Sequence, residues 1–132
     1  MLAKLHLSWR FKVWYSNAEM LRAVAGPVLR EVAERAKVDE SNVNIYSCHD
    51  VSLLGILHAV KATVGGGEDG GGYWPGYGSW VAFEVHEGED GGRTVRVKLD
   101  GKPCKFEGCD GEGGIGLEEF RELAVGLGEV EF

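Results

Sequence analysis

The sequence predicts a single α/β domain, and three observations support this class. An amphipathic helical pattern over 27–37 is followed by a β-branched and aromatic run over 43–47, and then by a mostly apolar helical pattern over 51–62. Two alternating runs, 79–86 and 93–99, predict a β-hairpin with a long loop. Helix–strand–helix order followed by paired strands is typical of α/β domains rather than of all-α or all-β domains.

Composition limits the class of protein further. The 132 residues suit one compact domain, and the net charge is −7 with acidic and basic residues interleaved. That balance argues against a nucleic-acid-binding protein, which would need a basic stripe to neutralise phosphates. No apolar run approaches the roughly 18–20 residues that span a bilayer. Lys4, His6 and Arg10 interrupt the N-terminal stretch, so no export signal is expected in the chain as written.

The first elements are expected to be one strand and two short helices. Residues 4–13 alternate strictly between apolar and polar, which predicts a half-buried strand. Asn17 opens a helical stretch that Gly26-Pro27 interrupts. Because proline suits the first turn of a helix, a second helix is expected to begin at Pro27 and to run to about residue 37.

The later elements follow from turn signals. The segment 65–72 contains six glycines and two acidic residues, which predicts a flexible surface loop rather than a phosphate-binding loop. Asp100-Gly101 predicts a tight turn that returns the chain into 102–106. Apolar residues at helical spacing over 117–127 predict a terminal helix.

His49, Asp50 and Ser52 form the candidate site. His49 and Asp50 stand where the predicted strand ends, and Ser52 lies in the first turn of the helix that follows. Ligands of open α/β sheets bind beyond the carboxyl ends of strands, and a helix N-terminus favours an anion. An imidazole, a carboxyl and a hydroxyl group there suit a phosphoryl group that is held while a proton reaches its leaving oxygen.

A purely structural role for the same residues is the alternative. Aspartate is a favoured N-cap, and Asp50 in that role would accept a hydrogen bond from the backbone N–H of Leu53. His49 would then be a buried histidine whose two ring nitrogens are both hydrogen-bonded.

The three cysteines form no metal-binding pattern. Cys48, Cys104 and Cys109 contain no Cys-x-x-Cys pair, so neither zinc nor another metal cofactor is expected. Cys104 and Cys109 are close enough in sequence for a local disulfide in an oxidising compartment. Free thiols in a reducing compartment are the equally weighted alternative.

Eight pieces of the chain, in order, resemble the C-terminal half of the histidine acid phosphatases. This family is the branch of the histidine phosphatase superfamily that holds acid phosphatases, phytases and lysophosphatidate phosphatases. The likeness covers roughly residues 18–125, and its specificity lies in the order of the pieces. They are Leu21–Val32, Ile45–Leu54, Trp74–Ser79, Val81–Val85, Val95–Val97, Gly101–Pro103, Gly108–Cys109 and Leu117–Leu123.

The resemblance implies a fold, an activity and roles for two residues. The fold would be the C-terminal part of a doubly wound domain with an antiparallel β-hairpin extension. The reaction would be phosphomonoester hydrolysis through a phosphohistidine, without a cofactor. His49 matches the family's phosphate-contacting histidine, and Asp50 matches the aspartate that protonates the leaving alcohol. Members of the family are often secreted or found in organelles.

The chain departs from the family at the nucleophile. The family uses the histidine of an Arg-His-Gly-x-Arg motif, and this chain has no Arg-His-Gly; its only histidines are His6, His49, His58 and His86. The resemblance therefore implies a portion that is inactive alone and would need the N-terminal half as its partner. A non-catalytic phosphate- or phospholipid-binding module is the alternative. A metal-dependent His-Asp phosphohydrolase is the third hypothesis. It is disfavoured, because that chemistry needs further histidines and aspartates on helices to hold the metal, whereas this His-Asp pair ends a predicted strand.

Overall fold

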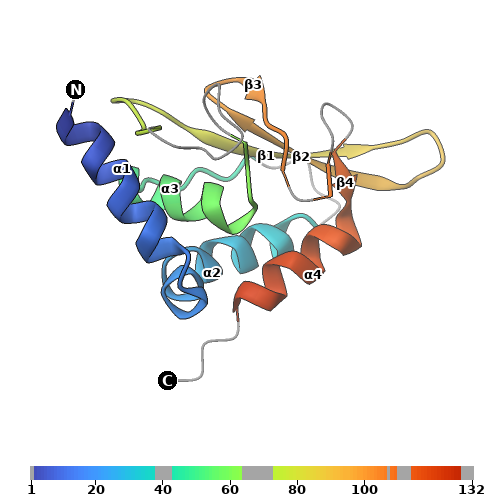
Figure 1. Ribbon diagram of the computed structural model, residues 1–132. Helices are drawn as coiled ribbons and strands as arrows, with labels where there is room; N and C mark the ends of the chain where they lie inside the picture. The colour runs from blue at the N-terminus through green and yellow to red at the C-terminus, as the bar shows by residue number, and fades with distance from the viewer. Residues whose placement is uncertain (1, 38–42, 64–72, 107, 110–113, 129–132) are drawn as a thin grey trace.

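The computed structural model describes residues 2–37, 43–63, 73–106, 108–109 and 114–128. Within these ranges it is a mixed α/β structure in which the helices lie on one side of an open antiparallel sheet (Figure 1). The predicted α/β class is confirmed; the doubly wound arrangement implied by the resemblance stays a prediction. The elements in chain order are α1 (Leu2–Tyr15), α2 (Ala18–Arg35), α3 (Asp50–Ala59), β1 (Val81–Glu87), β2 (Arg93–Leu99), β3 (Lys102–Pro103), β4 (Ile115–Gly116) and α4 (Leu117–Gly128).

Strand β2 is the centre of the sheet. It pairs with β1 in antiparallel register from Val81 opposite Leu99 to Glu87 opposite Arg93, which confirms the predicted hairpin. The other edge of β2 carries β3 and β4, both antiparallel. The predicted turn at Asp100-Gly101 is also confirmed, and both residues have positive φ, 51° and 80°.

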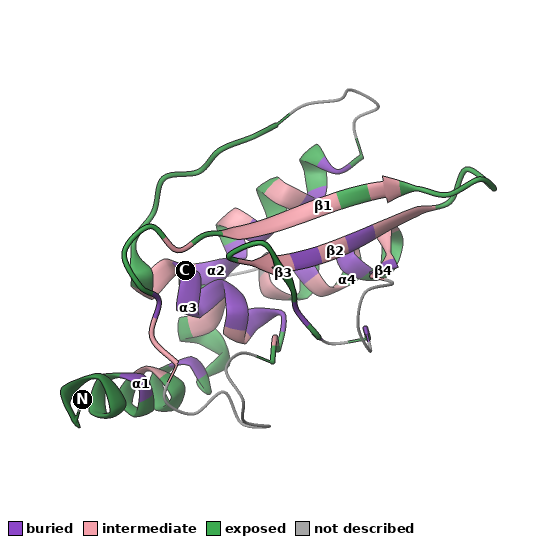
Figure 2. Cartoon of the chain, turned by 90° about the horizontal axis from the view of Figure 1, so that it is seen from above, coloured by how far each residue is buried: buried purple, intermediate pink, exposed green. Residues whose placement is uncertain are grey.

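The core lies between α2, α4 and the inner face of β2. Leu29 of α2, Val95 of β2 and Phe120 of α4 are each 0% exposed. Phe83 of β1 packs on Phe120 with ring centroids 5.5 Å apart, so the hairpin is tied to the helical layer. Figure 2 shows the buried residues of the helices facing the sheet, while α1 is exposed along most of its length.

The strand expected over 4–13 is wrong, because these residues belong to helix α1. A strand needs a neighbouring strand for its backbone groups, whereas a helix pairs its own. The side chains that face the body are Ser8, Phe11 and Tyr15, at helical spacing. The alternation of apolar and polar residues over 4–13 therefore does not mark the two faces of a strand. It arises because α1 carries apolar residues on more than one side.

The break expected at Gly26-Pro27 is also wrong. Helix α2 begins at Ala18, capped by the Asn17 side chain, which accepts from the backbone N–H of Met20, and continues through Pro27 to Arg35. Proline removes one helical hydrogen bond. Ala25, Gly26 and Leu29 are buried around it, so packing keeps the helix continuous.

The strand expected over 43–47 does not form among the described residues. This run has neither helical nor strand pairing, and Val43 and Ile45 are 90% and 89% exposed. A β-branched run becomes a strand only where a sheet edge is available to it. The predicted glycine-rich loop, 65–72, lies outside the described residues.

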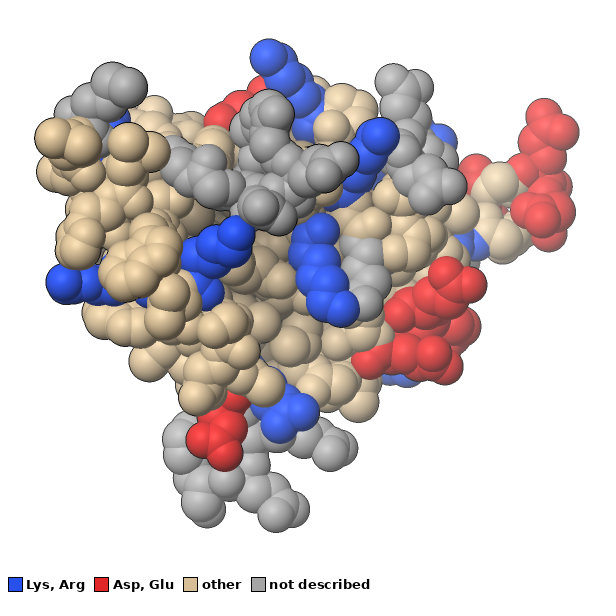
Figure 3. Space-filling view, viewed as in Figure 1, with Lys and Arg blue, Asp and Glu red and all other residues tan. Residues whose placement is uncertain are grey.

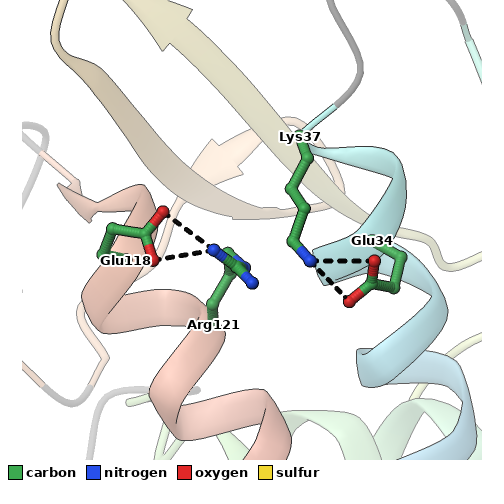
Figure 4. A network of polar contacts seen from close by, with 4 residues as sticks. All are labelled: Glu34, Lys37, Glu118 and Arg121. Carbon is green, nitrogen blue, oxygen red and sulfur yellow. Dashed lines mark hydrogen bonds and ion pairs between the residues drawn. The ribbon is translucent and has the colours of Figure 1, made fainter.

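The facing ends of α2 and α4 carry compensated charges (Figure 4). Lys37 Nζ donates to both carboxylate oxygens of Glu34, at 2.8 and 2.9 Å, and Arg121 Nη1 donates to both oxygens of Glu118, at 2.9 and 2.7 Å. The hydrogen bond from Lys37, with a smaller contribution from Arg121, lowers the pKa of Glu34. These exposed pairs add little stability, so the core sets the helix positions.

Gly55 sets how closely α3 approaches α2. A Cβ atom at Gly55 would lie 2.7 Å from Cγ1 of Val24, which is closer than real contacts allow. A Cβ atom added at Gly126 of α4 would have no heavy atom within 4 Å. The two glycines therefore form a matched pair within the helices.

We expect Gly55→Ala to lower the free energy of unfolding by about 1–2 kcal/mol, because overpacking outweighs the gain in helix propensity. Gly126→Ala should instead raise it by up to about 1 kcal/mol. Adding Val24→Ala to Gly55→Ala should recover part of the loss. Urea unfolding measures all three variants. Equal stabilisation by both glycine substitutions would contradict the close approach.

Candidate functional site

The first turn of α3 places the predicted site residues. His49 is the N-cap residue, with extended backbone at φ −101° and ψ 166°. Its carbonyl oxygen accepts from the backbone N–H groups of Ser52, at 3.0 Å, and Leu53, at 3.1 Å. Its side chain makes no capping hydrogen bond and is exposed. The imidazole is therefore exposed at the helix N-terminus and does not cap a backbone N–H group there.

Asp50 is the first residue of the helix and has a partner on each carboxylate oxygen. Oδ1 accepts from the backbone N–H of Val51 at 2.8 Å, and Oδ2 accepts from Trp74 Nε1 at 3.1 Å. The side chain remains exposed. Two donors orient the carboxylate at the end of the helix where the dipole favours a negative charge.

The purely structural alternative is wrong in its details. The N–H of Leu53 bonds to the His49 carbonyl, so Asp50 does not cap it. His49 is exposed rather than buried. Ser52 is half-buried in the same turn. The structure thus brings His49, Asp50 and Ser52 to one helix end, although the strand that was to precede them is absent from the described residues.

Aromatic side chains of α1 support this helix end. Phe11 packs edge-on against Trp74, with ring centroids 5.5 Å apart, and against Trp14 at 4.9 Å. Tyr15 is 5% exposed, and its hydroxyl donates to the carbonyl of Val51 at 2.7 Å. Burial, and secondarily the negative charge of Asp50, raise the pKa of Tyr15. Helix α1 therefore holds the first turn of α3 in place through residues far away in sequence.

Sequence reasoning missed Tyr15 and Trp74 as site residues. Trp74 stands in one of the pieces that resemble the phosphatase family, which is the signal that could have singled it out. Tyr15 gave no comparable signal, because its partner Val51 is 36 residues away and only the packing of α1 on α3 brings them together.

The other histidines have different surroundings. His58 packs against Tyr15, with ring centroids 5.4 Å apart, and its Nδ1 lies 2.9 Å from the carbonyl oxygen of Leu54. His86 lies 3.1 Å from a carboxylate oxygen of Glu84. Nε2 of His6 lies 3.2 Å from Nη2 of Arg10. In the part of the chain that the structure describes, no three His, Cys, Asp or Glu side chains are grouped as a metal site.

Cys104 and Cys109 are both buried, and the structure does not join them in a disulfide. Burial raises the pKa of the Cys104 thiol, which keeps it protonated and poorly nucleophilic. Phe106 and Cys109 exchange backbone hydrogen bonds, at 3.4 and 2.9 Å.

A groove of about 480 Å³ lies at the opposite end of α3 from His49. It opens between α2, α4 and the last turn of α3, and its polar lining residues are His58, Lys61, Glu119 and Glu122. Because it does not include His49, Asp50 or Ser52, it is separate from the candidate site.

Comparison with known proteins adds no relative. No protein-family model, no curated protein and no solved structure matches the chain. Among the described helices, none is long and apolar enough to cross a membrane.

We expect Tyr15→Phe to lower the free energy of unfolding by about 1 kcal/mol at neutral pH through loss of the bond to Val51. Because the folded state raises the pKa of Tyr15, the folded protein keeps this proton after the unfolded chain has begun to lose it. Stability should therefore fall as pH rises above the unfolded value near 10.0, and the variant should lose less over that range.

Urea unfolding at pH 7 and at pH 10.5 measures both effects. Tyr77→Phe is the matched control, because Tyr77 is fully exposed and should change nothing. A Tyr15→Phe protein as stable as the control variant at neutral pH would contradict the role of this hydroxyl group.

Proposed function

We propose that this chain is the C-terminal portion of an acid phosphatase of the histidine acid phosphatase family. The observation that carries the proposal is the placement of His49 and Asp50 at the exposed N-terminus of α3, in the order that the family's motif requires. The ordered sequence resemblance over roughly residues 18–125 gives the same assignment.

In this proposal His49 contacts the phosphate and Asp50 protonates the leaving alcohol. The backbone N–H groups of Val51, Ser52 and Leu53 already bond to Asp50 and His49, so the anion gains from the helix dipole and the imidazole rather than from those amides. Asp50 accepts a hydrogen bond on each oxygen, and these two bonds fix the orientation of the group that would protonate the leaving alcohol.

The proposal also requires a nucleophile from outside this chain. No Arg-His-Gly is present, and His6, His58 and His86 each lie against another group, namely Arg10, the carbonyl of Leu54 and Glu84. A second portion of the enzyme, carrying the nucleophilic histidine, would supply it. The exposed Val43 and Ile45, directly before the site, support such a partner, because a sheet edge from that portion would cover them.

We expect no turnover of p-nitrophenyl phosphate by the chain alone, because loss of a nucleophile removes most of the catalysis of a cooperating unit. A colorimetric assay between pH 4 and pH 8 measures this. Turnover that disappears in both His49→Ala and Asp50→Asn would overturn the view of an incomplete site. It would show that the chain is itself an enzyme.

Phosphate binding is expected to respond in opposite directions at the two site residues. His49→Ala should abolish it. Asp50→Asn should tighten it by about fivefold, because removal of a like charge at about 4 Å in water is worth about 1 kcal/mol. Titration of the ¹⁵N-labelled protein with inorganic phosphate, followed at the Ser52 amide, measures both variants.

His86→Ala is the matched control, since His86 pairs with Glu84 on the hairpin and should bind phosphate like the unmodified protein. Phosphate binding without turnover, both in the chain alone and in the presence of any N-terminal portion, would favour the non-catalytic phosphate-binding module. Absence of a His49-dependent response would contradict both functions.

A further inference from the structure

Helix α1 presents an apolar ridge to solvent on the side opposite the protein body. Ser8, Phe11 and Tyr15 face inward. At 100° per residue the outward ridge is formed by four residues spaced three or four apart. These residues and their exposed fractions are Leu2 (84%), Leu5 (44%), Trp9 (61%) and Val13 (49%).

Two basic residues flank this ridge. The helix contains Lys4, Arg10 and Lys12 and no acidic residue, in a chain whose net charge is −7. Arg10 and Lys12 fall on opposite sides of the ridge on the helical wheel, whereas Lys4 falls on the side of Phe11 and Tyr15. In Figure 3 the left edge of the molecule, where α1 lies, shows Lys and Arg among uncharged atoms, and the largest group of Asp and Glu lies on the right, with smaller groups at the top and the lower left.

We propose that α1 binds the surface of an anionic lipid bilayer, lying in the interfacial plane with its ridge among the headgroups and upper acyl chains. An outward apolar stripe with tryptophan, bordered by lysine and arginine, is the pattern of interfacial helices. At 14 residues, about 21 Å of helix, α1 is too short to cross the roughly 30 Å hydrocarbon layer.

Two protein occupants fit the same ridge less well. A second copy docked through α1 would bring the basic flanks of two identical helices together, because a two-fold interface repeats the same patch on both sides. An apolar protein groove would have to accommodate two cations beside the ridge, and lysine is depleted in the cores of protein interfaces. Anionic headgroups match both the ridge and its flanks.

The position of α1 in the fold makes it a rigid anchor rather than a loose tail. Phe11 and Tyr15 fix its inner face to Trp74 and to α3, so membrane contact would leave the packing of the inner face intact. The proposal concerns where the chain is held and is independent of the phosphatase assignment, since it uses neither His49 nor Asp50.

Co-sedimentation with vesicles tests it. The protein should bind vesicles of phosphatidylcholine with 30 mol% phosphatidylserine at least roughly tenfold more tightly than phosphatidylcholine alone, and added salt should weaken the binding. The double variant Arg10→Glu/Lys12→Glu should weaken it by at least roughly tenfold. Lys102→Glu/Lys105→Glu changes the net charge equally at exposed positions outside α1 and should retain binding.

Fluorescence quenching by brominated lipids locates the contact. Quenching should fall in Trp9→Phe and persist in Trp80→Phe, whose tryptophan is also exposed but lies beyond α1. Circular dichroism checks that each variant is folded. Failure of the folded protein to bind anionic vesicles would overturn the proposal, as would equal losses in the two charge variants. A dimer in solution that Trp9→Phe dissociates, without vesicle binding, would assign the ridge to a protein contact.

Discussion

Burial of Leu29, Val95 and Phe120 between α2, β2 and α4 is the interaction on which the rest of the structure depends. These side chains are fully removed from solvent and come from three elements that are distant in sequence. Once α2 is fixed by this core, Gly55 allows α3 to lie directly against it. Helix α1 then packs on α3 through Tyr15, which contacts the ring of His58 and the carbonyl of Val51. The candidate site is thus positioned at the end of a series of contacts that begins in the core.

The site at the end of that series is open on one side. Helix α1 and Trp74 support the first turn of α3, while His49 and Asp50 remain exposed. Electrostatic stabilisation of a transition state needs groups that surround the reacting atoms and exclude water. One exposed histidine and one oriented carboxylate meet only part of that requirement. This agrees with the proposal that a second portion of the enzyme completes the site.

Two exposed apolar regions differ in what would cover them. The run Val43–Tyr46 has no basic residue, and its backbone lacks sheet or helix pairing, so it suits addition to the edge of a sheet. The outward ridge of α1 has its backbone groups satisfied within the helix and carries basic flanks, so it suits a charged and deformable surface. Because the backbone and the charges differ, we propose different partners for these two similarly exposed regions.

The sequence by itself determined the elements whose pattern is local. The β1–β2 hairpin, the Asp100-Gly101 turn, α3 and α4 each follow from residues within a few positions of one another, and His49, Asp50 and Ser52 were placed correctly at a helix start. Only the tertiary structure decided that 4–13 is a helix, that α2 continues through Pro27, and that 43–47 lacks a strand partner. It also brought Trp74 to Asp50, 24 residues away. Packing and strand pairing are long-range interactions, and a local pattern of apolar residues does not specify which distant surface will meet it.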